Sequence, residues 1–221
     1  MKKIIILLFF AQSILGQEVN TIYYGDNYNI TSKDSAVYLR NYIYDSISKK
    51  YKFEEFLFFK APFDFIKSGE LTSINPEIKD GKFEWKNSLG DKVVCIYKKN
   101  MFFDIVEYKD ENDSLLEPVY EYWMIDSINE CDRKLKLFSE KFSNDLLNSG
   151  EIDMKFINSK TYVLFVVDKD GAISDAKILR GVEDKFNKSI IDKLVKYKFP
   201  PMTFKGKRVK VLFAMPVIIN K

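Results

Sequence analysis

Hydrophobic and polar residues alternate in short runs through the first half of the chain, a pattern typical of antiparallel β-structure. Aromatic and β-branched residues dominate four such runs, at 36–44, 52–60, 82–85 and 92–97. Glycine, asparagine, aspartate and serine separate the runs and mark turns at 25–27, 67–69, 80–81 and 89–91. The pattern predicts a meander of antiparallel strands and not a parallel sheet.

The last ninety residues begin with a helical pattern and continue with a hairpin. Apolar residues recur at three- and four-residue spacing from Asp132 onward, and Gly150 stands where a helix would be capped. That stripe consists of Leu135, Phe138, Phe142 and Leu146. A continuous apolar run at 161–167, a turn at 168–171 and a returning strand at 172–180 then predict a β-hairpin.

A second helix and a final strand complete the pattern. The apolar stripe of this helix stops ahead of Pro200, because proline restricts the preceding residue and cannot continue a helix. It consists of Val182, Phe186, Ile190, Ile191 and Leu194. Alternation at 209–216 predicts the last strand. An N-terminal meander followed by a small αββαβ domain predicts an α+β fold.

The N-terminus has the three parts of a secretory signal peptide. A basic start at 1–3 precedes an apolar segment at 4–15, and small residues lead to Gly16, after which we place the cleavage. The apolar segment is much shorter than the roughly 20 residues that a spanning helix needs. We therefore expect a periplasmic protein. The alternative is an uncleaved segment that anchors the chain in the inner membrane.

These patterns divide the chain into four parts. Residues 1–16 form the signal peptide, 17–110 the β-rich module, 111–131 the connection, and 132–221 the C-terminal domain. The segment 120–125 in the connection could add one more strand.

Composition restricts the chemistry that the chain can perform. Its 221 residues are 46% hydrophobic and 30% charged, enough for one or two cored domains, and they include no histidine. Catalysis by Ser-His-Asp or Cys-His and histidine metal sites are thereby excluded. No phosphate-binding glycine loop or Cys-x-x-Cys motif occurs either. We expect no enzyme, no cofactor, no metal and no small-molecule substrate; an enzyme using carboxylates or lysine is the alternative.

Charge is distributed unevenly along the chain. Residues 17–150 carry 18 basic and 24 acidic side chains, whereas 151–221 carry 15 basic and 8 acidic ones. An exported protein does not meet nucleic acid, so the basic end points to an acidic protein partner, an anionic envelope polymer or lipid headgroups. A solvated lysine-rich face would produce the same composition.

Two cysteines allow a single internal disulfide. Cys95 and Cys131 would close a loop of about 36 residues, worth on the order of 3–4 kcal/mol in an oxidising compartment. Cys95 lies in an apolar run at 93–97, however, and a buried free thiol explains it equally well.

Part of the β-rich module resembles a repeat family. Gly69-Glu70-Leu71 and the run 80–92, which reads Asp-Gly-Lys-Phe-Glu-Trp-Lys-Asn-Ser-Leu-Gly-Asp-Lys, are similar to the MORN-variant repeats of exported proteins in Gram-negative bacteria. The resemblance covers about 50–110 and implies an array of aromatic-rich hairpins.

The C-terminal domain resembles the C-terminal domain of TonB, the periplasmic force-transmitting protein of Gram-negative bacteria. Three motifs carry the resemblance in order: the strand, Asp-x-x-Gly turn and strand at 165–179, the Phe199-Pro200-Pro201 segment before Gly206-Lys207, and the strand at 209–216. The resemblance covers about 132–221. It implies that the domain binds an extended segment of an envelope protein, such as a TonB-dependent outer-membrane receptor, by adding it as a strand to a sheet edge.

If the final strand is that edge, alternate residues of it would contact the partner. These are Lys207, Val209, Val211, Phe213 and Met215, which a sheet core would explain equally well. The chain lacks the spanning helix and proline-rich spacer of the energy-coupled members, so binding is expected and force transmission is not. The rival hypothesis is an assembly protein that forms a homodimer through the C-terminal sheet edge.

Overall fold

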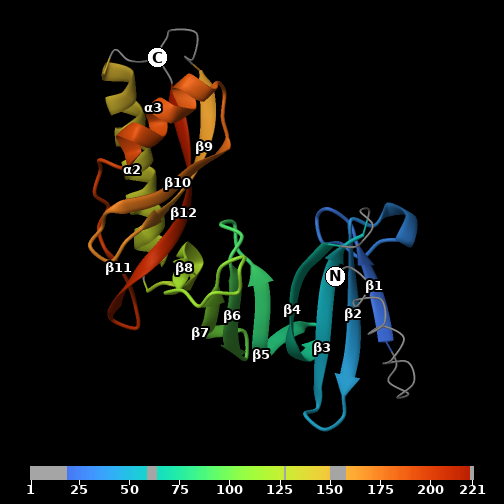
Figure 1. Cartoon of the computed structure of the whole chain (residues 1–221). Helices are drawn as coiled ribbons and strands as arrows, with labels where there is room; N and C mark the ends of the chain where they lie inside the picture. Colours follow the sequence, from blue (N-terminus) through green and yellow to red (C-terminus); the bar gives the residue numbers. More distant parts are fainter. Residues whose placement is uncertain (1–18, 59–63, 127, 150–157, 220–221) are drawn as a thin grey trace. The chain divides into compact units, whose positions relative to one another are not determined.

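The computed structural model describes residues 19–58, 64–126, 128–149 and 158–219. The chain divides into two compact units, Met1–Leu116 and Glu117–Lys221, shown together in Figure 1. Each unit is built on a largely antiparallel sheet, and the two α-helices of the described residues belong to the second unit. The fold is α+β, as the sequence predicts. The border between the units falls within the expected connection, 111–131.

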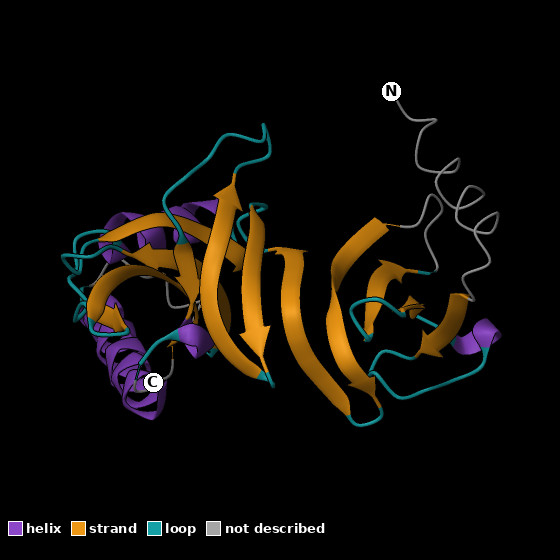
Figure 2. Ribbon diagram, turned by 90° about the horizontal axis from the view of Figure 1, so that it is seen from below, coloured by secondary structure: helices purple, strands orange, loops and turns teal. Residues whose placement is uncertain are grey.

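The first unit is a seven-stranded antiparallel meander in which each strand pairs with the next one in sequence (Figure 2). A short 3-10 helix, η1, lies at Lys33–Ser35 between the first two strands. The strands are β1 Val19–Tyr24, β2 Tyr38–Asp45, β3 Lys50–Leu57, β4 Asp64–Ile74, β5 Glu77–Lys86, β6 Lys92–Lys98 and β7 Met101–Lys109. All four predicted runs overlap strands, although residues 59 and 60 of the second run lie outside the described residues, and β1, β4 and β7 are additional.

Two of the predicted turns are wrong. Residues 67–69 lie inside β4 and residues 80–81 lie inside β5. Gly69 is opposite Phe83 in the ladder, and a Cβ on Gly69 would lie 2.5 Å from the Phe83 ring. The glycine therefore serves close packing of a ring against the neighbouring backbone, and not chain reversal.

One face of the meander gathers aromatic rings into a core. Tyr42, Phe53, Phe83 and Tyr97 follow one another across four strands, with ring centroids 6.1, 5.7 and 5.0 Å apart. All four are buried. In a strand, the side chains of consecutive residues point to opposite faces of the sheet. The residues directly before and after each of these rings in the sequence therefore point to the other face.

The predicted turn at 89–91 is confirmed, and a polar network stabilises it. Asn87 Oδ1 accepts hydrogen bonds from the N–H groups of Leu89 and Asp91, at 2.9 and 3.0 Å. Asn87 Nδ2 donates to the Tyr108 hydroxyl, which donates to Asp91. The β5–β6 turn is thus fastened to β7.

The second unit combines two helices with a five-stranded sheet. Its elements are β8 Val119–Glu121, the 3-10 helix η2 Tyr122–Met124, α2 Ile128–Asn148, β9 Ser159–Val167, β10 Ile173–Arg180, α3 Asp184–Leu194, β11 Met202–Phe204 and β12 Lys207–Ile219. The strand order is β10-β9-β12-β11, and β8 runs parallel to β12.

The predicted order of helix, strand, strand, helix and strand is confirmed for this unit, with β8 and β11 added. The first helix begins at Ile128, ahead of the expected Asp132. Val182 was expected in the apolar stripe of the second helix, but it precedes α3 and is exposed. The expected cap at Gly150 lies outside the described residues.

Rings from α2, β9 and β12 form the core of this unit. Phe138 contacts Phe165 and Phe199 at centroid distances of 6.4 and 5.3 Å, and Phe165 stacks on Phe213 at 5.8 Å. Tyr197, which follows α3, donates a hydrogen bond of 2.7 Å to Asp145 on α2. Both helices therefore contribute to one core.

Gly171 joins two distant parts of this core. Its φ is +88°, and a Cβ there would lie 2.1 Å from the carbonyl oxygen of Phe199. The Phe199 N–H donates to the Gly171 carbonyl at 2.9 Å. The β9–β10 turn is thus held against the segment that precedes the two prolines.

We expect Gly171→Ala to lower the free energy of unfolding by about 3 kcal/mol, through left-handed strain and the clash with Phe199. Gly206 is a matched control, because its φ is +74° and nothing lies within 4 Å of a Cβ there. Gly206→Ala should cost about 1 kcal/mol, from strain alone. Urea unfolding followed by circular dichroism measures both; equal losses would show that the close approach to Phe199 is unimportant.

Candidate functional site

The final strand is not the free edge that the sequence suggested. β9 pairs with β12 along Val211–Ile219, β8 pairs with Lys210–Leu212, and β11 pairs with Lys207–Val209. Four of the five expected contact residues, Val209, Val211, Phe213 and Met215, are buried in the core. Lys207 is exposed beside the turn that precedes the strand. The prediction that these residues contact a partner is therefore wrong, because β8, β9 and β11 already pair with β12.

Near the C-terminal end of β12, helix α2 lies on the side opposite β9, where no described strand pairs with β12. Ser139 Oγ donates a hydrogen bond to the carbonyl of Pro216, and Ser143 Oγ accepts one from the N–H of Ile218. Serine side chains thus take the place of a further strand at this end of β12.

One edge of the sheet is β10, for which β9 is the one strand partner among the described residues; the three-residue strands β8 and β11, which pair with β12, lie at the other margin. Residues of an antiparallel ladder direct their backbone groups alternately to one neighbour and to the other. Pro216 and Ile218 face α2, so Tyr162, opposite Pro216, directs its groups toward β10, and Val163 directs its groups toward β12. Ile178, which is opposite Val163, therefore presents its N–H and C=O to the outside of the sheet.

Two register shifts interrupt the pairing of β10 with β9. They lie between Ser174 and Lys177 and between Ile178 and Arg180. Asp175, in the first of them, has a φ of +48°. Bulges of this kind twist an edge and keep it from forming a long regular ladder with another sheet. Between the register shifts, the outer side of β10 therefore offers only short stretches of regular backbone.

The two cysteines are free thiols, so of the two alternatives that the sequence left open the structure has the buried free thiol and not the disulfide. Cys95 lies in β6 within the core of the first unit, and Cys131 lies in α2 of the second unit. Both are buried, and burial raises the pKa of the Cys95 thiol to about 12 and that of Cys131 to about 11. Each thiol packs as a small apolar group.

We expect neither cysteine to react with a thiol reagent near neutral pH, since a raised pKa and burial both suppress the thiolate. Unfolding in denaturant without reductant should release two reactive thiols, and the intact mass should equal that of the reduced chain. A mass loss corresponding to one disulfide would contradict the structure.

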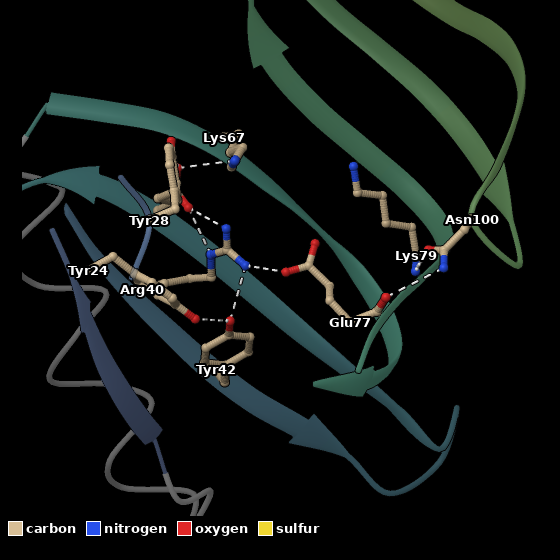
Figure 3. Close-up of polar contacts among 9 residues, drawn as sticks. Tyr24, Tyr28, Arg40, Tyr42, Lys67, Glu77, Lys79 and Asn100 are labelled. Atoms are coloured by element: carbon tan, nitrogen blue, oxygen red, sulfur yellow. Dashed lines mark hydrogen bonds and ion pairs between the residues drawn. The ribbon is translucent and has the colours of Figure 1, made fainter. Parts of the chain in front are cut away.

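A cluster of charged side chains interrupts the aromatic face of the first unit, and sequence analysis missed it (Figure 3). Arg40 on β2 faces Glu55 on β3, and Glu55 faces Lys67 on β4 in the ladder. The Arg40 side chain is 5% exposed and that of Glu55 is 0% exposed. Arg40 Nε and Nη2 donate to Glu55 Oε2 at 2.8 and 2.5 Å.

Other side chains complete the pairing of Glu55. Its Oε1 accepts a hydrogen bond of 3.0 Å from the Tyr28 hydroxyl and lies 3.3 Å from Lys67 Nζ. Burial raises the pKa of Tyr28, and the nearby Glu55 carboxylate raises it further. Burial lowers the pKa of Lys67, an effect that Glu55 opposes and Arg40 reinforces.

Arg40 also reaches the tip of the β4–β5 hairpin. Its Nη1 lies 2.6 Å from Glu77 Oε2 and donates to the Tyr42 hydroxyl at 3.1 Å. The guanidinium carbon is 4.5 Å from the centroid of the Phe53 ring. Burial alone would lower the pKa of Arg40, but Glu55, Tyr42 and Glu77 raise it above its ordinary value.

The β6–β7 turn is fastened to the same hairpin tip. Asn100 Oδ1 accepts a hydrogen bond of 2.6 Å from the Lys79 N–H, and the Asn100 N–H donates to the Lys79 carbonyl at 2.8 Å. Lys79 Nζ lies 5.0 Å from the centroid of Tyr97. The turn, the hairpin tip and the aromatic core are thereby held together.

The cluster joins separate segments of the first unit. Glu55 and Glu77 each pair with a cation, and Tyr28 brings the β1–β2 loop to β3. Charged residues at 40 and 55 among aromatic residues at alternate positions were the signal in the sequence. A buried arginine and a buried glutamate on one aromatic face are expected to form an ion pair, because either charge would be costly to bury alone.

Three comparisons with known proteins gave no match: no family model, no curated protein and no solved structure is significantly similar to the chain. Among the described residues, no helix is long and apolar enough to cross a membrane. No group of three or more cysteine, aspartate or glutamate side chains in that part of the chain is arranged to hold a metal ion.

We expect Arg40→Met to lower the stability of the first unit by about 3–5 kcal/mol, because it leaves Glu55 buried without its main partner. Lys52→Met is the matched control: its ion pair with Asp45 is 56% exposed on the lysine side, so the loss of stability should be far smaller than for Arg40→Met. Thermal unfolding of both variants measures the difference. Equal losses would mean that burial of the Arg40 pair is energetically unimportant.

Proposed function

We propose that the protein is an exported, non-catalytic binding protein whose C-terminal unit takes up an extended segment of an envelope protein by strand addition. The observation that carries the proposal is the position of β10 at the edge of the sheet, with outward backbone groups at Ile178. An unpaired N–H and C=O at a sheet edge can pair with any extended chain, and side chains then select among chains.

The resemblance to the TonB C-terminal domain supports this role. Its motif residues are in contact: the turn at 168–171 and Phe199 exchange a backbone hydrogen bond, and the strand at 209–216 pairs with β9. In that family the domain binds segments of outer-membrane receptors by strand addition. We transfer that mode to β10, because β12 lies inside the sheet.

Export to the periplasm is part of the proposal and rests on the N-terminal sequence. Residues 1–18 lie outside the described residues, so the support is the basic, apolar and small-residue pattern alone. If the segment is retained, the same strand addition would serve an anchored transducer. For the first unit, the resemblance to MORN-variant repeats and its aromatic core support a role as a recognition module.

Self-association through β10 is the second candidate function, since a free edge also permits pairing with another copy. The register shifts at 174–177 and 178–180 argue against it. In a dimer, the bulges of two β10 edges would have to match one another. A short peptide, in contrast, would pair only with the β10 residues between the bulges. Sedimentation of the full chain over a range of concentrations separates a monomer from a dimer.

We expect Ile178→Pro to abolish capture of extended peptides while leaving the sheet intact, because it removes an outward N–H and spares the ladder with β9. Ile178→Ala keeps that N–H and is the matched control for lost packing. A panel of synthetic alternating peptides is added to the full chain, and hydrogen exchange of the β10 amides is measured.

Peptide should protect the outward amide of residue 178 in the native chain and in Ile178→Ala. Peptide should leave the Ile178→Pro variant unaffected, although its circular dichroism matches that of the native chain. Undiminished binding by a folded Ile178→Pro variant would refute strand addition at β10.

A further inference from the structure

Two large apolar side chains are exposed at the corner where β10 ends and the chain turns toward α3, residues 179–182. Leu179 is 51% exposed and Val182 is 50% exposed. Leu179 lies in the register shift between Ile178 and Arg180, so no residue of β9 is paired with it. Single exposed apolar side chains are common on protein surfaces. These two are relevant because of their place: they follow Ile178, whose backbone groups point to the outside of the sheet.

Asn187, in the first turn of α3, fixes the corner. Its Oδ1 accepts a hydrogen bond of 3.2 Å from the Val182 N–H. A Cβ on Gly181 would clash with the same Oδ1, so this close approach requires glycine. The Asn187 N–H donates to the Glu183 carbonyl at 2.8 Å. The backbone that carries the two apolar side chains is therefore set before a partner binds, which lowers the entropy cost of binding.

The open stretch of this edge is short. At its start, Ala172 forms an isolated antiparallel bridge with Lys198, and the Asp168 N–H donates to the Ala172 carbonyl from the side of β9. Lys198 therefore lies on the outer side of β10. An added strand has to fit between the segment that holds Lys198 and the corner. Within that length it runs past Leu179.

A strand added to β10 would cover the two exposed side chains. Neighbouring strands lie about 4.8 Å apart, and opposite side chains come within roughly 5 Å of each other. A large apolar side chain of the added strand would therefore reach Leu179 and, at the end of the strand, Val182. It would remove apolar surface from water on both chains, whereas a polar side chain would lose its own hydration there.

We propose that the segment bound at β10 carries a large apolar side chain that packs on Leu179 and Val182. This inference rests on the proposed function, because it names the kind of segment that strand addition at β10 selects. Backbone hydrogen bonds at Ile178 accept any extended chain, and the apolar contact at the corner selects among such chains.

The test uses two uncharged synthetic peptides of equal length, one alternating valine with threonine and one made of threonine alone. Valine and threonine are both β-branched and favour strands, so the peptides differ mainly in apolar surface. Because neither peptide is charged, the charged side chains near the edge affect both alike.

Each peptide is titrated into the full chain, into the corner variant Leu179→Thr/Val182→Thr, and into a control, Leu137→Thr/Val106→Thr. The control makes the same two substitutions on α2 and β7, at side chains that are 56% and 58% exposed. Val182→Thr alone serves as a milder second variant of the corner. Circular dichroism compares the fold of each variant with that of the native chain.

We expect the native chain and the control to bind the valine peptide about tenfold more tightly than the threonine peptide. The corner variant should bind both peptides equally, and Val182→Thr should reduce the preference. Equal binding of both peptides by the native chain would overturn this inference and leave strand addition standing. A preference that persists in the corner variant, or that the control loses as well, would also overturn it, by tracing apolar selection to another surface. Failure of both peptides to bind would instead overturn the proposed function.

Discussion

The C-terminal unit depends on one constraint, that backbone groups on both sides of the thirteen-residue strand β12 must be paired. β9 pairs one side along Val211–Ile219, and β8 pairs with Lys210–Leu212. Where no strand is available, Ser139 and Ser143 of α2 supply the hydrogen bonds. Because strands pair with β12 on both sides, β12 is not an edge of the sheet, whereas β10 is one.

The first unit is under a different constraint: charged side chains are buried in its aromatic face and must be paired. Arg40 satisfies Glu55 in the neighbouring strand and Glu77 at the tip of the β4–β5 hairpin, while Tyr28 brings the β1–β2 loop to the same carboxylate. An isolated buried charge would be costly, so the hairpin tip and the loop are fixed where their partners lie. A buried pair of this kind specifies an arrangement more than it adds stability.

Two of the sequence motifs of the C-terminal unit lie against each other in the fold. The glycine of the Asp-x-x-Gly turn has a positive φ and lies against Phe199 of the Phe-Pro-Pro segment. Those two motifs are therefore parts of one packing contact. The final strand was predicted to be the binding edge from its alternating pattern. Alternation predicts to which face of the sheet each side chain points, but it does not indicate how many other strands pair with that strand.

The sequence by itself determined the α+β class, the four aromatic strands of the meander and the order of helices and strands in the C-terminal unit. These depend on local periodicity, capping and turn residues, which act over a few positions. Tertiary structure decided that Gly69 lies within a strand, that Cys95 and Cys131 are free thiols, and that β10, unlike β12, is an edge of the sheet. It also brought Arg40 to Glu77 across 37 positions of sequence. Such contacts depend on which strands become neighbours, and spacing along the chain carries no measure of that.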